Sequence, residues 1–337
     1  MRRRWKKIAC IAFLSIVCLL ALAITLTIGW RPIIGARARS LTNRQFERTQ
    51  ARHERGRYLV ENVMGCFDCH SEKDWNQPGA PPVEGKIGAG KDWSMDGMPW
   101  LVVSNITPDH ETGAGNWTDD MLARAIREGI GYDGRALFPV MPYTSFRELS
   151  DEDLASVVVY LRSVKPVRNA LPQTKIPFPL SRLIQSVPQP VNEVVPPPDM
   201  ADPVKRGAYL TRMGGCSDCH TPQENGQPMP GLQFAGGFNL KHPRGEITTA
   251  NITPHPTGIS YYDEQLFLQM MRTGHVRART LNPIMPWIFY RGMTDEELKA
   301  VFAYLRTLKP VNHAVDNTEQ PTACKLCKQQ HGLGERN

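Results

Sequence analysis

The stretches GCFDCH at 65–70 and GCSDCH at 215–220 decide the fold of this chain of 337 residues. They place Cys-x-x-Cys-His twice in a sequence that has only 8 cysteines. Working outward, the flanking sequence is also repeated, in the same order and at nearly the same spacing. The matching pairs are RGRYLV (55–60) with RGAYLT (206–211), NITP (105–108) with NITP (251–254), RALFPVMP (135–142) with RTLNPIMP (279–286), and YLRSVKPV (160–167) with YLRTLKPV (304–311). The chain is therefore a tandem duplication of a unit of about 115 residues, which is the size of a small domain.

The repeat divides the chain into segments. Eight prolines fall between the two copies, so this stretch is expected to be a semi-rigid, largely extended spacer. The predicted segments are a membrane anchor (1–30), a basic juxtamembrane segment (31–43), domain 1 (44–170), a Pro-rich linker (171–198), domain 2 (199–313) and a polar tail (314–337).

Each domain is predicted to be all-α with long loops. Ser150 and Thr294 each precede a helical apolar stripe and have an acid three residues later, which is the pattern of a capping box. A second helix in each copy, which starts near Thr118 in the first copy, is expected to end at Gly129 or Gly274. The Gly- and Pro-rich stretches between helices show no strand periodicity and are predicted to be loops.

The duplicated motif itself predicts chemistry. On one helical turn, cysteines at i and i+3 and a histidine at i+4 share a face. The pattern is typical of c-type haem attachment, in which two thiols bond the porphyrin and the histidine binds the iron. A zinc site is the alternative, but neither copy supplies the second cysteine pair that a structural site would need. Two covalently bound haem c groups are predicted, held by Cys66, Cys69, His70, Cys216, Cys219 and His220.

The sixth iron ligands are predicted to be Met141 and Met285. They alone among the 13 methionines occupy equivalent places in the shared context L-x-P-x-M-P. Flanking prolines stiffen both loops, and Met/His ligation is typical of electron-transfer haems. The alternative is that each methionine only fills its haem pocket.

The N-terminus carries a targeting signal. Residues 8–30 contain no charged side chain, which is long enough for a transmembrane helix, and five basic residues precede them. Basic residues favour the cytoplasmic side, so the domains are expected outside the inner membrane, facing the periplasm. A cleaved signal peptide, with Ala36-x-Ala38 as its site, is the competing interpretation.

Charge excludes another class of function. Residues 1–55 carry ten net positive charges, whereas the rest of the chain carries three net negative charges. That is not the basic surface of a nucleic-acid-binding protein, and no such motif is present.

These motifs resemble those of tandem class I cytochromes c over residues 44–313. The stretch from NITP at 105 to MPY at 143 is similar to cytochrome c subunits that accept electrons from periplasmic alcohol, aldehyde and gluconate-type dehydrogenases. The resemblance implies a dihaem, single-pass, inner-membrane electron carrier without a substrate of its own. Its implied partners are a dehydrogenase or quinol-side donor and a terminal oxidase or soluble cytochrome. The rival function is that of a dihaem cytochrome c peroxidase-like enzyme, which needs one open iron position.

Many members of that group have three haems, and here the sequence departs from the pattern. Only CKLCK at 324–328 remains, with lysine in place of histidine. For Cys324 and Cys327 a disulfide or a plain tail is favoured, since an exported protein meets an oxidising compartment. A metal clip that includes His331 is the alternative.

Overall fold

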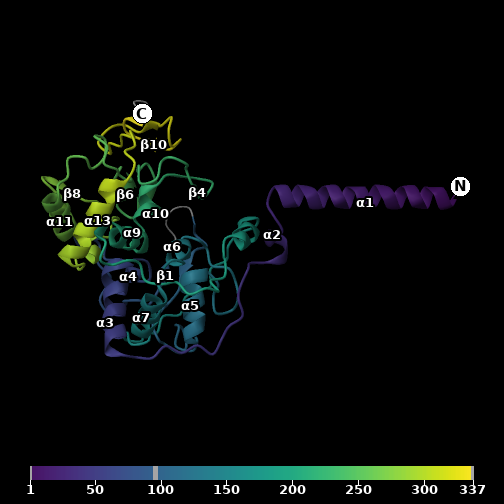
Figure 1. Ribbon diagram of the computed structural model, residues 1–337, viewed down its shortest axis with the longest axis horizontal. Helices are drawn as coiled ribbons and strands as arrows, with labels where there is room; N and C mark the ends of the chain where they lie inside the picture. The colour runs from purple at the N-terminus through teal and green to yellow at the C-terminus, as the bar shows by residue number, and fades with distance from the viewer. Residues whose placement is uncertain (1, 94–97, 335–337) are drawn as a thin grey trace.

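The computed structural model describes residues 2–93 and 98–334 of the chain. Two helical domains lie against each other, and one long helix projects away from them (Figure 1). The first half comprises α1 (Arg2–Leu26), α2 (Arg31–Ile34), α3 (Gln50–Tyr58), the π-helical turn η1 (Leu59–Val63), α4 (Cys66–Cys69), α5 (Asp119–Glu128), α6 (Tyr143–Phe146) and α7 (Asp151–Leu161). The second half comprises α8 (Leu180–Leu183), η2 (Ile184–Ser186), α9 (Pro203–Met213), α10 (Cys216–His220), α11 (Glu264–Thr273), α12 (Trp287–Tyr290) and α13 (Asp295–Thr307). The prediction of two helical domains is confirmed.

In each domain the first helix crosses the last helix closely. A Cβ atom added to Gly56 in α3 would lie 1.9 Å from the carbonyl oxygen of Ser156 in α7. The second domain repeats the crossing, since a Cβ at Gly207 in α9 would lie 1.9 Å from the carbonyl oxygen of Ala300 in α13. Only glycine fits at these two positions, and the haem-motif turns α4 and α10 follow directly from the helices so fixed.

The predicted helix ends are confirmed. The side-chain oxygen of Thr118 accepts a hydrogen bond from the backbone N–H of Met121 at the start of α5. Helices α5 and α11 both end at a glycine with positive φ, at Gly129 (71°) and Gly274 (69°). Because helices begin and end where side chains or glycine satisfy the terminal backbone groups, these boundaries are local properties of the sequence.

The loops contain short antiparallel ladders that the sequence did not predict. The ladders pair β1 (Lys91–Asp92) with β2 (Val102–Val103), β3 (Gln223–Glu224) with β4 (Gln227–Pro228), β5 (Asn239–His242) with β6 (Gly245–Thr248), β7 (His275–Val276) with β8 (Arg279–Thr280), and β9 (Thr322–Ala323) with β10 (Gln330–His331). Strands of two to four residues are too short to show period-two alternation, so turn geometry rather than hydrophobic pattern sets them.

The two domains are joined by a reciprocal pair of tyrosines. Tyr209 in α9 donates to a carboxylate oxygen of Asp153 at 2.6 Å and accepts from the backbone N–H of Ser150 at 3.2 Å. In the mirror contact, Tyr58 in α3 donates to Glu297 and accepts from the backbone N–H of Thr294 at 3.0 Å. Each tyrosine therefore stands between the N-cap and the acid of the other domain's last helix.

This contact corrects the predicted capping boxes. Ser150 and Thr294 do cap their helices, because each side chain accepts from the backbone N–H three residues later. The acids three residues on do not bond back to the N-cap N–H groups, as the box requires. A tyrosine from the other domain takes that place, which only the tertiary structure could show.

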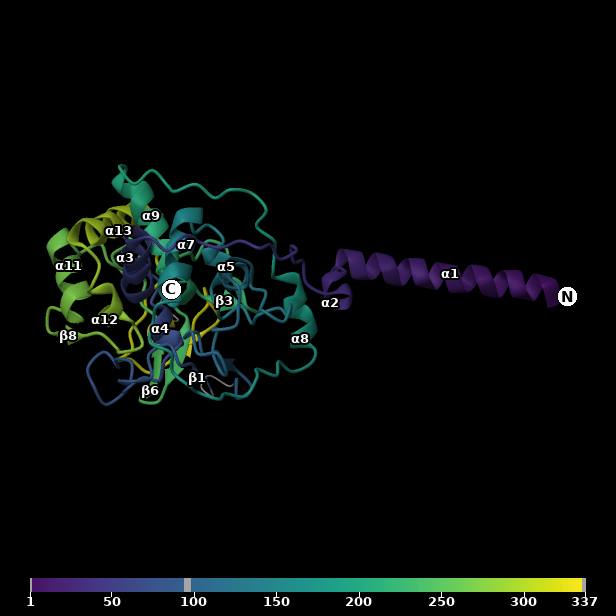
Figure 2. The ribbon, with the colours of Figure 1, turned by 90° about the horizontal axis from the view of Figure 1, so that it is seen from below.

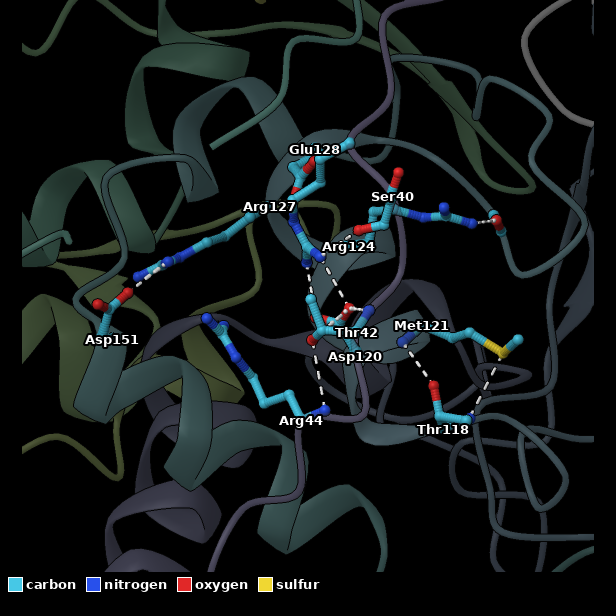
Figure 3. Close-up of polar contacts among 12 residues, drawn as sticks. Ser40, Thr42, Arg44, Thr118, Asp120, Met121, Arg124, Arg127, Glu128 and Asp151 are labelled. Atoms are coloured by element: carbon cyan, nitrogen blue, oxygen red, sulfur yellow. Dashed lines mark hydrogen bonds and ion pairs between the residues drawn. The ribbon is translucent and has the colours of Figure 1, made fainter. Parts of the chain in front are cut away.

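The juxtamembrane segment is tied to domain 1. Arg39 forms two hydrogen bonds of 2.7 Å with the fully buried Asp120 and a third of 2.7 Å with Glu128. Burial opposes ionisation of Asp120, but the hydrogen bonds from Arg39 and Thr42 outweigh it and keep the pKa of Asp120 below its usual value. Figure 3 shows Thr42 beside Asp120, and Arg127 of the same helix reaching Asp151.

The Pro-rich linker follows the surface of domain 1 and is not extended throughout. Thr174 hydrogen-bonds both the N–H and the carbonyl oxygen of Val102. In its middle, α8 and η2 fold against α2, close to where the long N-terminal helix ends (Figure 2).

Replacing Tyr209 with Phe is expected to destabilise the folded protein by about 1–3 kcal/mol, because the buried carboxylate of Asp153 and the N–H of Ser150 lose a partner. Chemical denaturation of the detergent-solubilised protein measures the loss. The matched control is Tyr132→Phe, at an exposed ring. Equal stabilities for the two variants would contradict the assigned role of Tyr209.

Candidate functional site

The two Cys-x-x-Cys-His motifs adopt the predicted helical turns. Cys66 and Cys69 lie in α4 with His70 as its C-cap, and α10 carries the second set. The ring Nδ1 of His70 hydrogen-bonds the carbonyl oxygen of Ser104 at 2.8 Å. His220 makes the same bond to the carbonyl oxygen of Ala250 at 2.7 Å. A carbonyl at Nδ1 fixes the tautomer, so Nε2 on the opposite side of the ring carries the lone pair for a metal.

The histidines are kept in the form that binds iron. Burial is the main cause that lowers the pKa of His70 to about 4; the nearby Lys91 acts in the same direction, and the hydrogen bond to Ser104 opposes both. Burial likewise lowers the pKa of His220. Both imidazoles are therefore neutral at pH 7, as ligation requires.

Each NITP loop begins directly after the residue whose carbonyl oxygen holds the haem-motif histidine, Ser104 or Ala250. Asn105 accepts from the backbone N–H and the hydroxyl of Thr107, at 3.0 and 2.7 Å, and donates to the carbonyl oxygen of Val167 at 2.8 Å. Asn251 makes the corresponding bonds to Thr253 and Val311, at 2.9, 2.8 and 2.9 Å. Each loop is thus bound to the segment that follows the last helix of its domain. These side chains brace the loop.

Domain 1 also offers groups that suit an anionic haem propionate. Trp93 has a buried indole N–H without a hydrogen-bond partner among the described residues. The ammonium group of Lys91, a largely buried side chain, lies 4.9 Å from the centroid of that ring. A donor and a cation beside the motif fit the haem that the cysteines imply.

Met141 and Met285 occupy equivalent positions in the structure. Both are partly buried and pack against the same hydrophobic core as Cys66 and Cys216. Each lies two residues before a short helix, α6 or α12, whose first residue donates its N–H to the methionine carbonyl oxygen at 2.8 Å.

Sequence reasoning missed how closely the two sites approach each other. Ser145, four residues after Met141, donates to a carboxylate oxygen of Asp218 at 3.4 Å, and Asp218 lies inside the second haem motif. Helix α6 packs on α9, and α12 packs on η1. The methionine-side helix of each domain therefore meets the helix that leads into the other domain's haem turn. One feature of the sequence could have indicated this contact between the domains. The repeats RGRY and RGAY share a tyrosine, and these two residues, Tyr58 and Tyr209, make the reciprocal interdomain hydrogen bonds.

Comparison with known proteins identifies both domains as cytochrome c domains. The cytochrome c family model matches residues 53–165 and 204–309, one match per domain. The chain is 30% identical over 266 residues to the fructose dehydrogenase cytochrome subunit of Gluconobacter japonicus, covering 75% of this chain and 52% of that one. It is 30% identical over 295 residues to the gluconate 2-dehydrogenase cytochrome c subunit of Pantoea cypripedii, covering 82% and 64%. It is also 30% identical over 261 residues to a diheme cytochrome c-type protein of Cereibacter sphaeroides, covering 73% and 83%.

The chain thus spans about half to two thirds of the length of the two dehydrogenase subunits and most of the length of the dihaem protein. Both domains match, and both carry an attachment motif, so the protein has two covalently bound haem c groups. Bound haem supplies an iron that gains and loses one electron. The residues around it set its ligands, exclude water and shape its potential.

The mass of the intact protein, matured by haem-attachment machinery, is expected to show two haem adducts. The double variant Cys66→Ala, Cys69→Ala removes one adduct, because it leaves no thiol in the first motif to form a thioether bond. The matched control changes Cys10 and Cys18 to Ala in α1 and keeps both adducts. A third adduct on the peptide that holds Cys324 would contradict the assignment.

Proposed function

Because the chain belongs to the cytochrome c family, we propose that it is a membrane-anchored dihaem electron carrier. It takes single electrons from a periplasmic dehydrogenase or a quinol-side donor and passes them to a terminal oxidase or soluble cytochrome. The observation that carries this proposal is the joining of two equivalent haem domains through their methionine-side helices.

The interface suits electron transfer between the two haems. One continuous hydrophobic core runs through both domains and includes Val63 of η1 and Met213 of α9, both fully buried. Ser145 touches the second attachment turn through Asp218. The reciprocal tyrosines hold the domains in one relative position, so the distance between the two haems stays constant. A fixed distance through a packed, dry medium favours transfer within the chain.

Met141 and Met285 are proposed as the sixth ligands. Their equivalent loops, prolines and core contacts support two similar, closed iron sites. Closed Met/His sites favour electron transfer, and thioether ligation raises the reduction potential. The peroxidase alternative needs one open or displaceable position, for which the two equivalent loops offer no asymmetry.

The donor is proposed to be the catalytic subunit of a dehydrogenase. Two of the relatives are named as cytochrome subunits of fructose dehydrogenase and gluconate 2-dehydrogenase. The chemistry of oxidation would then belong to the partner, and this chain would act on no small molecule itself. The relative named as a diheme cytochrome c-type protein supports a carrier with two haems.

The inner membrane is proposed as the location, with both haem domains on the periplasmic side. Arg4–Leu26 of α1 is long and apolar enough to span a bilayer, and its apolar stretch is not buried against the rest of the protein. Near the end of that helix, α2 and α8 form an apolar groove of about 410 Å³ lined by Ile33, Phe178 and Leu183 among others. Phe178 is 82% exposed. These exposed apolar side chains, continuous with α1, suit the membrane surface.

Met285→Ala is expected to abolish the near-infrared sulfur-to-iron absorption of one haem and to lower the potential of that haem, since a thioether ligand raises it. Met141→Ala does the same for the other haem. Met64→Ala, beside the first haem motif, is the control and leaves both bands intact. An unchanged spectrum in Met285→Ala would assign another ligand to domain 2 and favour the peroxidase.

The proposed function is tested by purifying the protein from detergent-solubilised membranes of the native host. A dehydrogenase is expected to co-purify, and its substrate is expected to reduce both haems. Addition of hydrogen peroxide to the reduced protein tests the peroxidase alternative. Rapid reoxidation of the reduced protein by peroxide, without a co-purified dehydrogenase, would replace the electron carrier with the peroxidase.

A further inference from the structure

Four metal-binding side chains meet at the C-terminal end of the molecule. His313, Cys324, Cys327 and His331 are 0%, 3%, 1% and 2% exposed, and their ligand atoms all lie within 4.8 Å of one another. No disulfide joins the two thiols, so the disulfide that the sequence favoured is not formed. The segment is not a plain tail either. It folds into the β9–β10 hairpin over domain 2 (Figure 1).

The spacing of these atoms fits one tetrahedral ion. The two Nε2 atoms of the histidines lie 3.1 Å apart. The Sγ atom of Cys324 lies 3.4 Å from His313 Nε2, and that of Cys327 lies 3.3 Å from His331 Nε2. Zinc bound to two nitrogens and two sulfurs at ordinary bond lengths separates its ligands by about 3.3–3.8 Å. Three of the six pairs of ligand atoms therefore lie close to the separations that zinc requires, and the other pairs are within 4.8 Å, so small side-chain movements bring all four atoms onto one ion.

The histidine rings are oriented as ligands. His313 Nδ1 hydrogen-bonds the carbonyl oxygen of Ala235 at 2.9 Å, and His331 Nδ1 hydrogen-bonds that of Gly332 at 3.0 Å. Each carbonyl holds the proton on Nδ1, so both Nε2 lone pairs point into the cluster and at each other. Two buried lone pairs repel unless a cation lies between them. A backbone carbonyl that accepts from the Nδ1 proton is the usual partner of a histidine whose other ring nitrogen binds a metal.

The local backbone brings the ligands together. The N–H of Cys324 donates to the carbonyl oxygen of Gln329 at 2.9 Å, and the N–H of Lys328 donates to that of Cys324 at 2.9 Å. This tight turn places Cys324, Cys327 and His331 on one side, while His313 comes from the segment after α13. A Cβ on Gly237 would lie 2.5 Å from the ring of His313, so domain 2 leaves only enough room for glycine.

We propose that these four side chains form a structural zinc site. Two thiolates and two neutral imidazoles around Zn²⁺ have no net charge, which suits a buried position. All four positions are filled by protein, so the site is closed and has no place for a substrate. A two-iron cluster is a poorer fit, because it would divide the ligands between two separate irons.

The ion would hold residues 314–334 on domain 2. Among the residues that the structure describes, the hydrophobic cluster beneath this segment has four buried members, and two of them are Cys324 and Cys327. Such a small core does not by itself order a hairpin of this length, so a cross-link such as a bound metal ion is needed. The loop of domain 2 that holds His313 through Ala235 also contacts the second haem motif. Its next residue, Gly236, donates its N–H to the carbonyl oxygen of His220 at 2.7 Å. The zinc site therefore also braces the second haem turn.

Metal analysis of the full-length protein with both haems tests the proposal. One zinc ion per two irons is expected. Cys327→Ser and His331→Ala each lose the zinc, keep both haems and become more sensitive to protease between residues 314 and 334. The control is His275→Ala, which changes an exposed histidine and retains the zinc.

X-ray absorption at the zinc edge of the unmutated protein gives a result that does not depend on how the variants fold. Two sulfur neighbours at about 2.3 Å and two nitrogen neighbours at about 2.0 Å are expected. Zinc retained in both variants, a different metal at full occupancy, or a Cys324–Cys327 disulfide in the isolated protein would each overturn the proposal.

Discussion

The whole molecule depends on one close helix crossing, made twice. In each domain the first and last helices touch where Gly56 faces Ser156 and where Gly207 faces Ala300. Any larger residue would push the helices apart, so these contacts fix the angle at which the chain leaves the first helix. The haem turn comes next in sequence. The histidine that ends it is held by the carbonyl oxygen of the residue before the NITP loop, Ser104 or Ala250. Ligand position is thus set by backbone packing rather than by the ligands themselves.

The same helices also hold the two domains together. Tyr58 and Tyr209 follow the crossing glycines by two residues and reach the capped start of the other domain's last helix. A duplicated sequence favours such an interface, because one favourable contact is obtained twice under a pseudo-two-fold arrangement. Helix capping, domain docking and the placement of the haem turns are therefore coupled. Loss of one tyrosine hydroxyl removes a hydrogen bond from the N-cap of the last helix in the other domain.

Much of this could be predicted from the sequence because it depends on neighbours in the chain. Cysteines and histidine at i, i+3 and i+4 define an attachment turn wherever the turn lies. Thr118 and Gly129 mark the ends of α5 through local backbone bonds. The uncharged run before Trp30 defined a helix, although the structure ends it at Leu26. The short ladders escaped prediction because strands of two to four residues are too short for an alternating pattern to be detected.

Two haem-attachment turns, their histidines, the duplicated helical domains and an apolar N-terminal helix could all be predicted from the amino-acid sequence, because each depends on the spacing of a few residues. Contacts between distant segments became visible in the folded structure alone. Tyr209 meets Asp153 across 56 residues, Arg39 reaches Asp120 across 81, and His313 meets His331 across 18. Such pairs leave no periodic trace, because packing of whole helices and loops, rather than local backbone geometry, brings their side chains together.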